Sequence, residues 1–178
     1  IVISNQSGRS NILSRLERYG IKIDSKDPKI QKILDEVKDR EFSGYSYDGA
    51  DASFELLANR LLGKVPEFLK VESYNVNVSK AKNISTKANV TFLIDNKKIE
   101  CSGEGNGPVN ALDNAIRSNF KKVEKYYNFF SDLKLLDYKV RILNTGTEAT
   151  TRVLIESTDK SGKSWFTVGV SPNIIEAS

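Results

Sequence analysis

The chain has 178 residues, of which 39% are apolar and 28% charged, and its formal net charge is +4. This apolar fraction is large enough for a hydrophobic core, so the composition excludes a wholly disordered chain. Residues 1–45 and 46–178 each carry a net charge of +2. A nucleic-acid-binding protein usually concentrates its basic residues, and this chain does not.

Several residue types that would support other functions are missing or rare. The chain contains no His, the commonest general base and metal-ligating side chain, and Cys101 is its single cysteine. A disulfide framework and a thiolate metal cluster are therefore excluded, and we expect no catalytic residue, metal or cofactor in this segment. The sequence shows neither a signal peptide nor an apolar run of about 18 residues, so we expect a cytoplasmic protein without membrane contact.

The first 45 residues are interpreted as a helical linker. A first helix is expected to begin at the cap residue Ser10 and to end at Gly20, and a second is expected to begin at Asp27-Pro28. Both have apolar residues at helical spacing on one narrow face. Two such helices do not form a stable domain alone, so we expect them to connect to another module.

A third helix is expected at residues 48–63, and the pattern then changes to strands. Tyr74, Val76 and Val78 alternate with polar residues, which is typical of a strand with one solvated face. A turn signal at Asp95-Asn96 predicts a hairpin between the next two strands. A helix is then expected over residues 108–127.

The same order of elements is repeated 64 residues later. Val140 follows Val76, and both Gly169 and Pro172 follow Gly105 and Pro108, by this interval. The fold class is therefore predicted as α+β: a helical linker followed by two repeated βββα modules with mostly antiparallel sheets. The copies span about 64–130 and 131–178, and the last helix is expected to be cut short. Because the chain also lacks Met, we expect it to be part of a longer protein.

The repeated Gly-x-x-Pro corner is the strongest local candidate for a binding site. Glycine permits a tight turn, and proline is expected at the first helical position in both copies. The free N–H groups and the positive end of the helix dipole suit a carboxylate or a phosphate. A corner without a ligand is the alternative, and the spacing alone favours that alternative.

Two nucleic-acid or nucleotide interpretations were compared with this one. The glycines of residues 103–107 are not followed by the Lys and Ser/Thr that a P-loop requires. The αβββα order also matches a double-stranded-RNA-binding module, which needs basic residues at the start of its last helix. That helix begins Pro108-Val109-Asn110 and its first basic residue is Arg117, so RNA binding is kept as an alternative from another class.

Four segments resemble one known family. Residues 47–57, 105–113, 136–143 and 167–178 are similar to the C-terminal regulatory domain of the 2-isopropylmalate synthase and citramalate synthase family. The Gly-Asn-Gly-Pro-Val-Asn-Ala-Leu-Asp string belongs to this set. The Ala-Ser-Phe-Glu-Leu-Leu and Asp-Tyr-Lys-Val-Arg-Ile-Leu strings resemble the citramalate synthase branch more closely. Residues 7–12 resemble the region just after the family's catalytic barrel.

The resemblance implies a regulatory function. Members of this family condense acetyl-CoA with a 2-oxo acid in an N-terminal metal-dependent barrel. The end product, isoleucine for citramalate synthases and leucine for isopropylmalate synthases, binds the C-terminal domain at a dimer interface and inhibits the enzyme. Residues 46–178 are therefore expected to form a non-catalytic, homodimeric effector-binding domain. Residues 1–45 would follow a barrel that lies outside this chain, together with its acetyl-CoA and divalent metal.

The resemblance also implies the position of the effector, isoleucine or alternatively leucine. Gly107 is expected to have a positive φ and to let the ligand approach the backbone. Ordinary core packing is the alternative for the apolar wall. The candidate residues are Asn106, Gly107, Pro108, Val109 and Asn110 at the first corner, Pro172, Asn173 and Ile174 at the second, and Leu135, Tyr138, Ile142, Ala149 and Thr151 in the wall.

Overall fold

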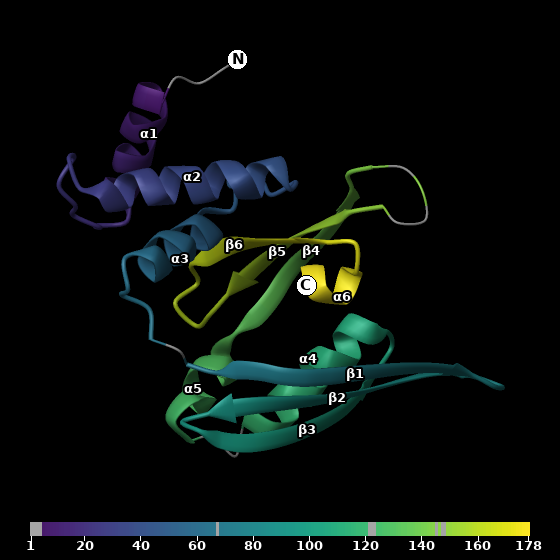
Figure 1. The fold of residues 1–178 in the computed structure, drawn as a ribbon. Helices are drawn as coiled ribbons and strands as arrows, with labels where there is room; N and C mark the ends of the chain where they lie inside the picture. Colours follow the sequence, from purple (N-terminus) through teal and green to yellow (C-terminus); the bar gives the residue numbers. More distant parts are fainter. Residues whose placement is uncertain (1–4, 67, 121–123, 145, 147–148) are drawn as a thin grey trace. The chain divides into compact units, whose positions relative to one another are not determined.

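The computed structural model describes residues 5–66, 68–120, 124–144, 146 and 149–178 (Figure 1). Its helices are α1 (Asn5–Arg18), α2 (Pro28–Phe42), α3 (Asp51–Leu61), α4 (Pro108–Phe120), α5 (Glu124–Asp132) and α6 (Ile174–Ala177). Its strands are β1 (Lys70–Lys80), β2 (Ile84–Ile94), β3 (Lys97–Gly105), β4 (Lys134–Ile142), β5 (Thr151–Thr158) and β6 (Ser164–Ser171).

The chain divides into two compact units, each with one three-stranded antiparallel sheet. One unit comprises residues 1–66, 135–157 and 164–178, and the other comprises residues 67–134 and 158–163. The strand orders are β1-β2-β3 and β4-β5-β6, so chain neighbours are also sheet neighbours. The predicted α+β class with two βββα modules is confirmed.

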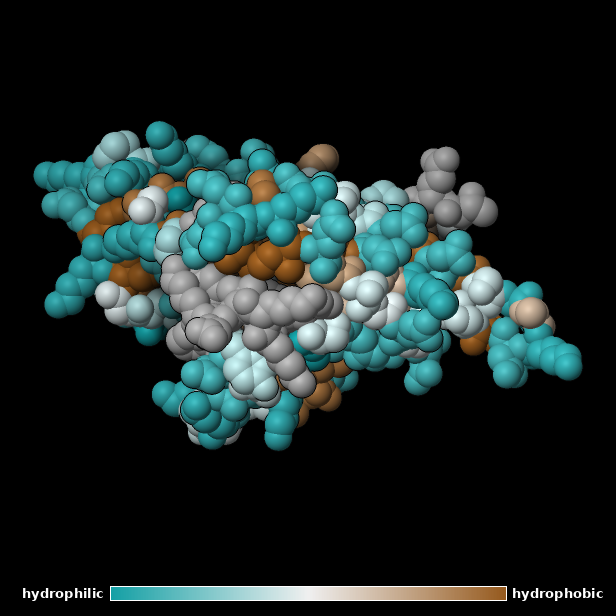
Figure 2. All heavy atoms as spheres, turned by 90° about the horizontal axis from the view of Figure 1, so that it is seen from below, coloured by the Kyte–Doolittle hydropathy of each residue, from teal (hydrophilic) through white to brown (hydrophobic). Residues whose placement is uncertain are grey.

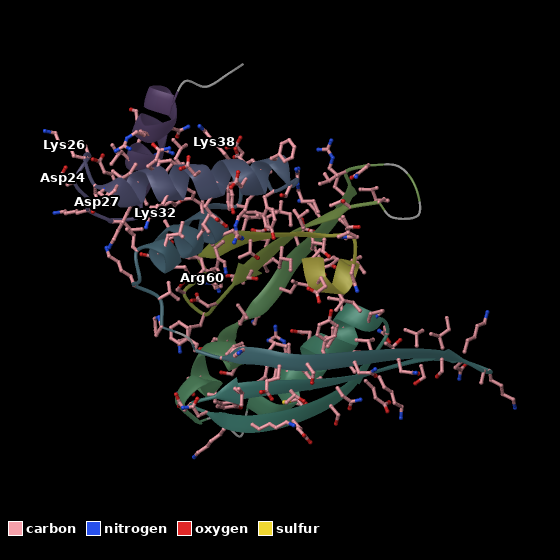
Figure 3. The ribbon with its side chains drawn as sticks, in the orientation of Figure 1. Asp24, Lys26, Asp27, Lys32, Lys38 and Arg60 are labelled. Carbon is pink, nitrogen blue, oxygen red and sulfur yellow. The ribbon has the colours of Figure 1, made fainter. Side chains whose placement is uncertain are left out.

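Helix α2 begins and ends where the sequence predicts. The carboxylate of the N-cap residue Asp27 accepts a hydrogen bond from the Lys29 N–H at 2.8 Å, and Pro28 is the first helical residue. Ser43 caps the other end, and Gly44 follows it with a φ of 105°. Figure 3 shows Asp27 with Asp24 and Lys26 around the start of this helix.

Replacing the N-cap residue tests this local stabilisation. Asp27→Ala removes the acceptor for a free N–H of the first turn, so the free energy of unfolding should fall by about 1 kcal/mol. Asp27→Asn keeps an acceptor and is the control. Urea denaturation of both variants provides the measurement. Equal midpoints for the alanine and wild-type chains would contradict the assigned cap.

The predicted start of the first helix is wrong. Helix α1 already includes Asn5, so Ser10 lies inside the helix and does not cap it. A close approach to α2 accounts for the helix at Gly8, a residue of low helical propensity. A Cβ atom at this position would lie 3.0 Å from the Leu34 Cδ1 atom.

The first 66 residues contribute to the core of the first unit. Leu16, Ile30, Ile33 and Phe54 from the first three helices are fully buried in one cluster. The Arg15 guanidinium lies 4.2 Å from the Phe54 ring centroid and donates to the Tyr47 carbonyl at 2.9 Å, so the one charged group in this region is held by three partners including Asp51. Helix α3 occupies most of the predicted range 48–63.

Two hydrogen bonds connect these helices to the second sheet within the same unit. The Arg152 Nε–H donates to the Gly44 carbonyl at 2.6 Å, and the Val168 N–H donates to the Ser53 hydroxyl at 2.9 Å. They join the end of α2 and the start of α3 to β5 and β6. The helical segment and this sheet therefore fold together.

The first sheet has the predicted hairpin and the predicted alternation. Asp95 and Asn96 form a two-residue turn with φ values of 48° and 61°, which suits the twist of an antiparallel hairpin. Val90 is buried and lies directly opposite Tyr74 on β1 and Cys101 on β3. Helix α4 covers this face. The helix predicted over 108–127 is described as α4 and α5, with residues 121–123 outside the described part.

The repeat interval is not constant along the second copy. Strand β4 starts 64 residues after β1, but α6 starts 66 residues after α4. The difference arises in the β5–β6 connection, residues 159–163, which is longer than the two-residue turn at Asp95-Asn96. Pro172 therefore precedes the N-cap Asn173, and its predicted place at the first helical position is wrong.

Candidate functional site

The corner before α4 is closed by one of its own side chains. The Asn106 N–H donates to the Asn110 Oδ1 atom at 3.1 Å, and the Ala111 N–H donates to the Gly107 carbonyl at 2.9 Å. A Cβ atom on Gly105 would lie 2.6 Å from Asn110 Oδ1 and 2.5 Å from the Ala111 nitrogen. The start of α4 therefore lies directly on Gly105.

The role expected of Gly107 is wrong. Its φ is not positive, and an added Cβ atom would meet no atom within 4 Å among the described residues. The close approach that the corner requires occurs at Gly105, and at Gly103 one turn of the alternation earlier. These two glycines are needed because the backbone of α4 occupies the space of a side chain, whatever their φ.

Sequence reasoning missed Thr86, which belongs to this corner. Thr86 lies directly opposite Gly105 in the β2–β3 pairing and is 2% exposed. Within the described residues its Oγ1 atom has no hydrogen-bond partner. The available signal was a hydroxyl at an inward position of the alternating strand Ile84–Ile94, where apolar residues otherwise stand.

The apolar wall predicted on β4 lies on an exposed face of the strand. Leu136, Val140 and Ile142 are 56%, 45% and 66% exposed, and they alternate with charged residues. Tyr138 shares their face by the period of two, is partly buried, and its hydroxyl lies 2.6 Å from the Ser178 hydroxyl. Leu135 falls on the opposite face of the strand. We call Leu136, Tyr138, Val140 and Ile142 the β4 apolar stripe.

The opposite face of β4 is charged. Asp137 and Lys139 form an ion pair with an O–N distance of 2.6 Å. The hydrogen bond from Lys139 lowers the pKa of Asp137, and the same bond raises the pKa of Lys139. Both groups stay charged near neutral pH, so β4 presents one ionic and one apolar face.

The remaining candidates lie beside this strand or at the second corner. Thr151 is buried at the start of β5, and Ala149 is partly buried just before it. At the second corner the Asn173 side chain accepts from the Ile175 N–H at 2.9 Å, and Pro172 and Ile174 are exposed. Helix α6 comprises four residues. Its first turn is capped internally by Asn173.

The candidate residues fall into two groups. Residues 106–110 belong to the unit formed by 67–134 and 158–163, and all the others belong to the second unit. Each group is therefore assessed separately. The structure brings Asn106 together with Asn110, and it brings Tyr138 onto one face with Ile142.

The basic residue considered for RNA binding is already engaged. The Arg117 side chain donates to the Asp113 carboxylate at 2.8 Å and to the Leu133 carbonyl at 2.8 Å. A guanidinium held in this way is not presented to a phosphate backbone. The structure thus offers no support for RNA binding at this residue.

Other features of the described part of the chain lie away from these candidates. A cavity of about 250 Å³ is lined by residues around the α1–α2 connection, and one of about 330 Å³ lies over the outer face of β2 and β3. Hydrophobic side chains reach the surface in separate places between hydrophilic ones on the face in Figure 2. Among the described residues no His, Cys, Asp and Glu cluster fits a metal ion. No described helix has the length and apolar character needed to cross a membrane.

Comparison with known proteins identifies relatives of this fold. The family model described as LeuA allosteric (dimerisation) domain matches residues 48–178. The chain is 46% identical to an (R)-citramalate synthase of Geobacter sulfurreducens and 43% identical to one of Aquifex aeolicus, each time over the whole chain and 34% of the relative. It is 29% identical to a 2-isopropylmalate synthase of Burkholderia ambifaria, over the whole chain and 32% of that protein. The chain therefore spans about a third of the length of these relatives.

Proposed function

Because the chain belongs to the family of LeuA allosteric (dimerisation) domains, we propose that it is the feedback-regulatory domain of a citramalate synthase. One observation carries this proposal: identity is 46% and 43% with two (R)-citramalate synthases and 29% with a 2-isopropylmalate synthase. The effector is then isoleucine, bound by a homodimer. Leucine is the effector if the isopropylmalate branch is correct.

Catalysis is assigned to another domain of a longer protein. The chain covers 34% of its citramalate synthase relatives, which leaves room for a catalytic domain with its acetyl-CoA and divalent metal. In such a protein, this domain acts by binding its effector more tightly in one state of the enzyme than in another. The effector can shift the enzyme only by that difference in affinity.

The two groups of candidate residues supply the chemistry that an aliphatic amino acid requires. The β4 apolar stripe supports contact with a branched side chain, because exposed apolar area gains free energy when a ligand or partner covers it. The start of α4 supports binding of a carboxylate, because N–H groups of the first turn lack intrahelical acceptors.

Calorimetric titration of the 178-residue chain with isoleucine and with leucine tests the proposal. Isoleucine should bind more tightly, by roughly 10- to 200-fold, which is the range that one displaced methyl group permits in an apolar pocket. Tighter binding of leucine would assign the chain to the isopropylmalate branch. The absence of binding of both amino acids would overturn the proposed regulatory function.

The homodimer is tested by a substitution in the β4 apolar stripe. The wild-type chain should sediment as a dimer at tens of micromolar concentration. Val140→Lys should sediment as a monomer, because an interface that covers this face would bury an unpaired ammonium group. Arg141→Ala, on the charged face of the same strand, is the control and should remain dimeric.

A monomeric wild-type chain would contradict the homodimer itself. A Val140→Lys chain that still sediments as a dimer would show that the interface lies outside the β4 apolar stripe. Circular dichroism of both variants should match the wild type, because both positions are exposed.

A further inference from the structure

The Thr86 hydroxyl is an unsatisfied polar group in a protein core. Its residue is 2% exposed, and Oγ1 has no partner within the described residues. Burying a hydroxyl without a hydrogen bond destabilises the folded chain, and almost all buried polar groups in proteins have a partner. Valine has the same shape and favours strands more strongly, so packing alone gives no reason for threonine here.

The register of the first sheet places this hydroxyl under the first turn of α4. Thr86 and Gly105 are directly opposite in the antiparallel pair, and directly opposite residues share one face of the sheet. The neighbouring pair on this face is Ala88 and Gly103, and a Cβ atom on Gly103 would lie 2.4 Å from the Ala115 nitrogen of α4. The face that carries Thr86 is therefore the face that α4 covers.

An oxygen acceptor already occupies this corner. Asn110 Oδ1 lies where a Cβ atom on Gly105 would stand, at 2.6 Å, and accepts the Asn106 N–H. Asn110 is exposed, so its side chain can leave this position and be solvated elsewhere. Its departure would leave the Asn106 N–H and the Thr86 hydroxyl as two donors without an acceptor.

We propose that the carboxylate of the amino-acid effector replaces the Asn110 amide oxygen and accepts a hydrogen bond from the Thr86 hydroxyl. The assignment rests on the proposed function, since it names a further binding residue for the same effector. It explains why the buried hydroxyl has no partner in the free chain, because its partner is the ligand. It also explains why Asn110 closes the corner in the absence of one.

Calorimetry and thermal denaturation of two variants of the 178-residue chain test the proposal. Thr86→Val should bind isoleucine about 10-fold more weakly, the loss expected for one hydrogen bond to a charged group. Its melting temperature without ligand should rise by about 2–4 °C, because the unsatisfied hydroxyl is gone. Thr86→Ser retains the hydroxyl and should bind isoleucine within about threefold of the wild type.

The opposite signs of the two effects separate binding from packing. A threonine that only packs would change the melting temperature and leave the affinity unaltered, and that result would overturn the assignment of Thr86 while leaving the proposed function intact. A wild-type chain that binds neither isoleucine nor leucine would overturn both.

The carboxylate is tested with 2-methylbutylamine, which is isoleucine without that group. Wild type and Thr86→Val should bind this amine equally, because neither can donate to a carboxylate that is absent. An equal loss of affinity for the amine and for isoleucine in Thr86→Val would overturn the contact with the carboxylate.

Discussion

Gly103→Val should lower the free energy of unfolding by about 3 kcal/mol, the cost of forcing a side chain into a filled core. A Cβ atom on Gly103 would lie 2.4 Å from the Ala115 nitrogen, 2.7 Å from the Ala115 Cα atom and 2.9 Å from the Ala111 carbonyl oxygen. All three are backbone atoms of α4, so no rotamer change can relieve the overlap. The helix must move away from the sheet, and the contacts of Val90 and Cys101 weaken with it.

Gly107→Ala is the matched control for this substitution. Gly107 lies four residues further along the same corner, and a Cβ atom there would meet nothing within 4 Å among the described residues. Its φ is not positive, so alanine should change the stability by less than about 1 kcal/mol. Guanidinium denaturation of both variants gives the comparison. Equal midpoints for Gly103→Val and wild type would show that α4 does not lie on Gly103.

The parts of the fold that depend on local sequence were predictable. The cap and proline at the start of α2 and the two-residue turn at Asp95-Asn96 follow from short-range hydrogen bonds and backbone preferences, and the structure has both. Strand alternation also held, because a sheet covered by one helix must separate apolar and polar faces. The repeat interval in the second copy was misread because loop length is not specified by the apolar pattern.

The parts that depend on contacts between distant segments were less predictable. A sequence does not show which glycine in Gly-x-Gly-x-Gly lies under a helix, and the structure identifies Gly103 and Gly105 where Gly107 was expected. Thr86 was missed for the same reason, since its lack of a partner is a property of the covering helix and not of the strand. The family resemblance supplied Tyr138 and Ile142, whose shared exposed face local patterning could indicate but not assign to a ligand.

The effect on ligand binding should be largest at Tyr138. Tyr138→Ala should weaken isoleucine binding by about 10- to 100-fold, because it removes the aromatic ring from the β4 apolar stripe. The ring is partly buried and its hydroxyl is fixed at 2.6 Å from the Ser178 hydroxyl, so it is held in place before a ligand arrives. A ring that is already ordered loses little further conformational entropy when it contacts the ligand.

Two variants separate the ring from its hydroxyl and from the strand as a whole. Tyr138→Phe keeps the ring and loses the contact with Ser178, so its affinity should stay within about fivefold of the wild type. Lys139→Ala alters the next residue, whose side chain lies on the charged face with Asp137, and should not change the affinity. Calorimetry with isoleucine measures all three chains. In a longer protein that includes the catalytic domain, the concentration of isoleucine needed for half-maximal inhibition should rise by the same factor for Tyr138→Ala, because inhibition follows from binding. A folded Tyr138→Ala chain with unchanged affinity would remove the β4 apolar stripe from the effector site.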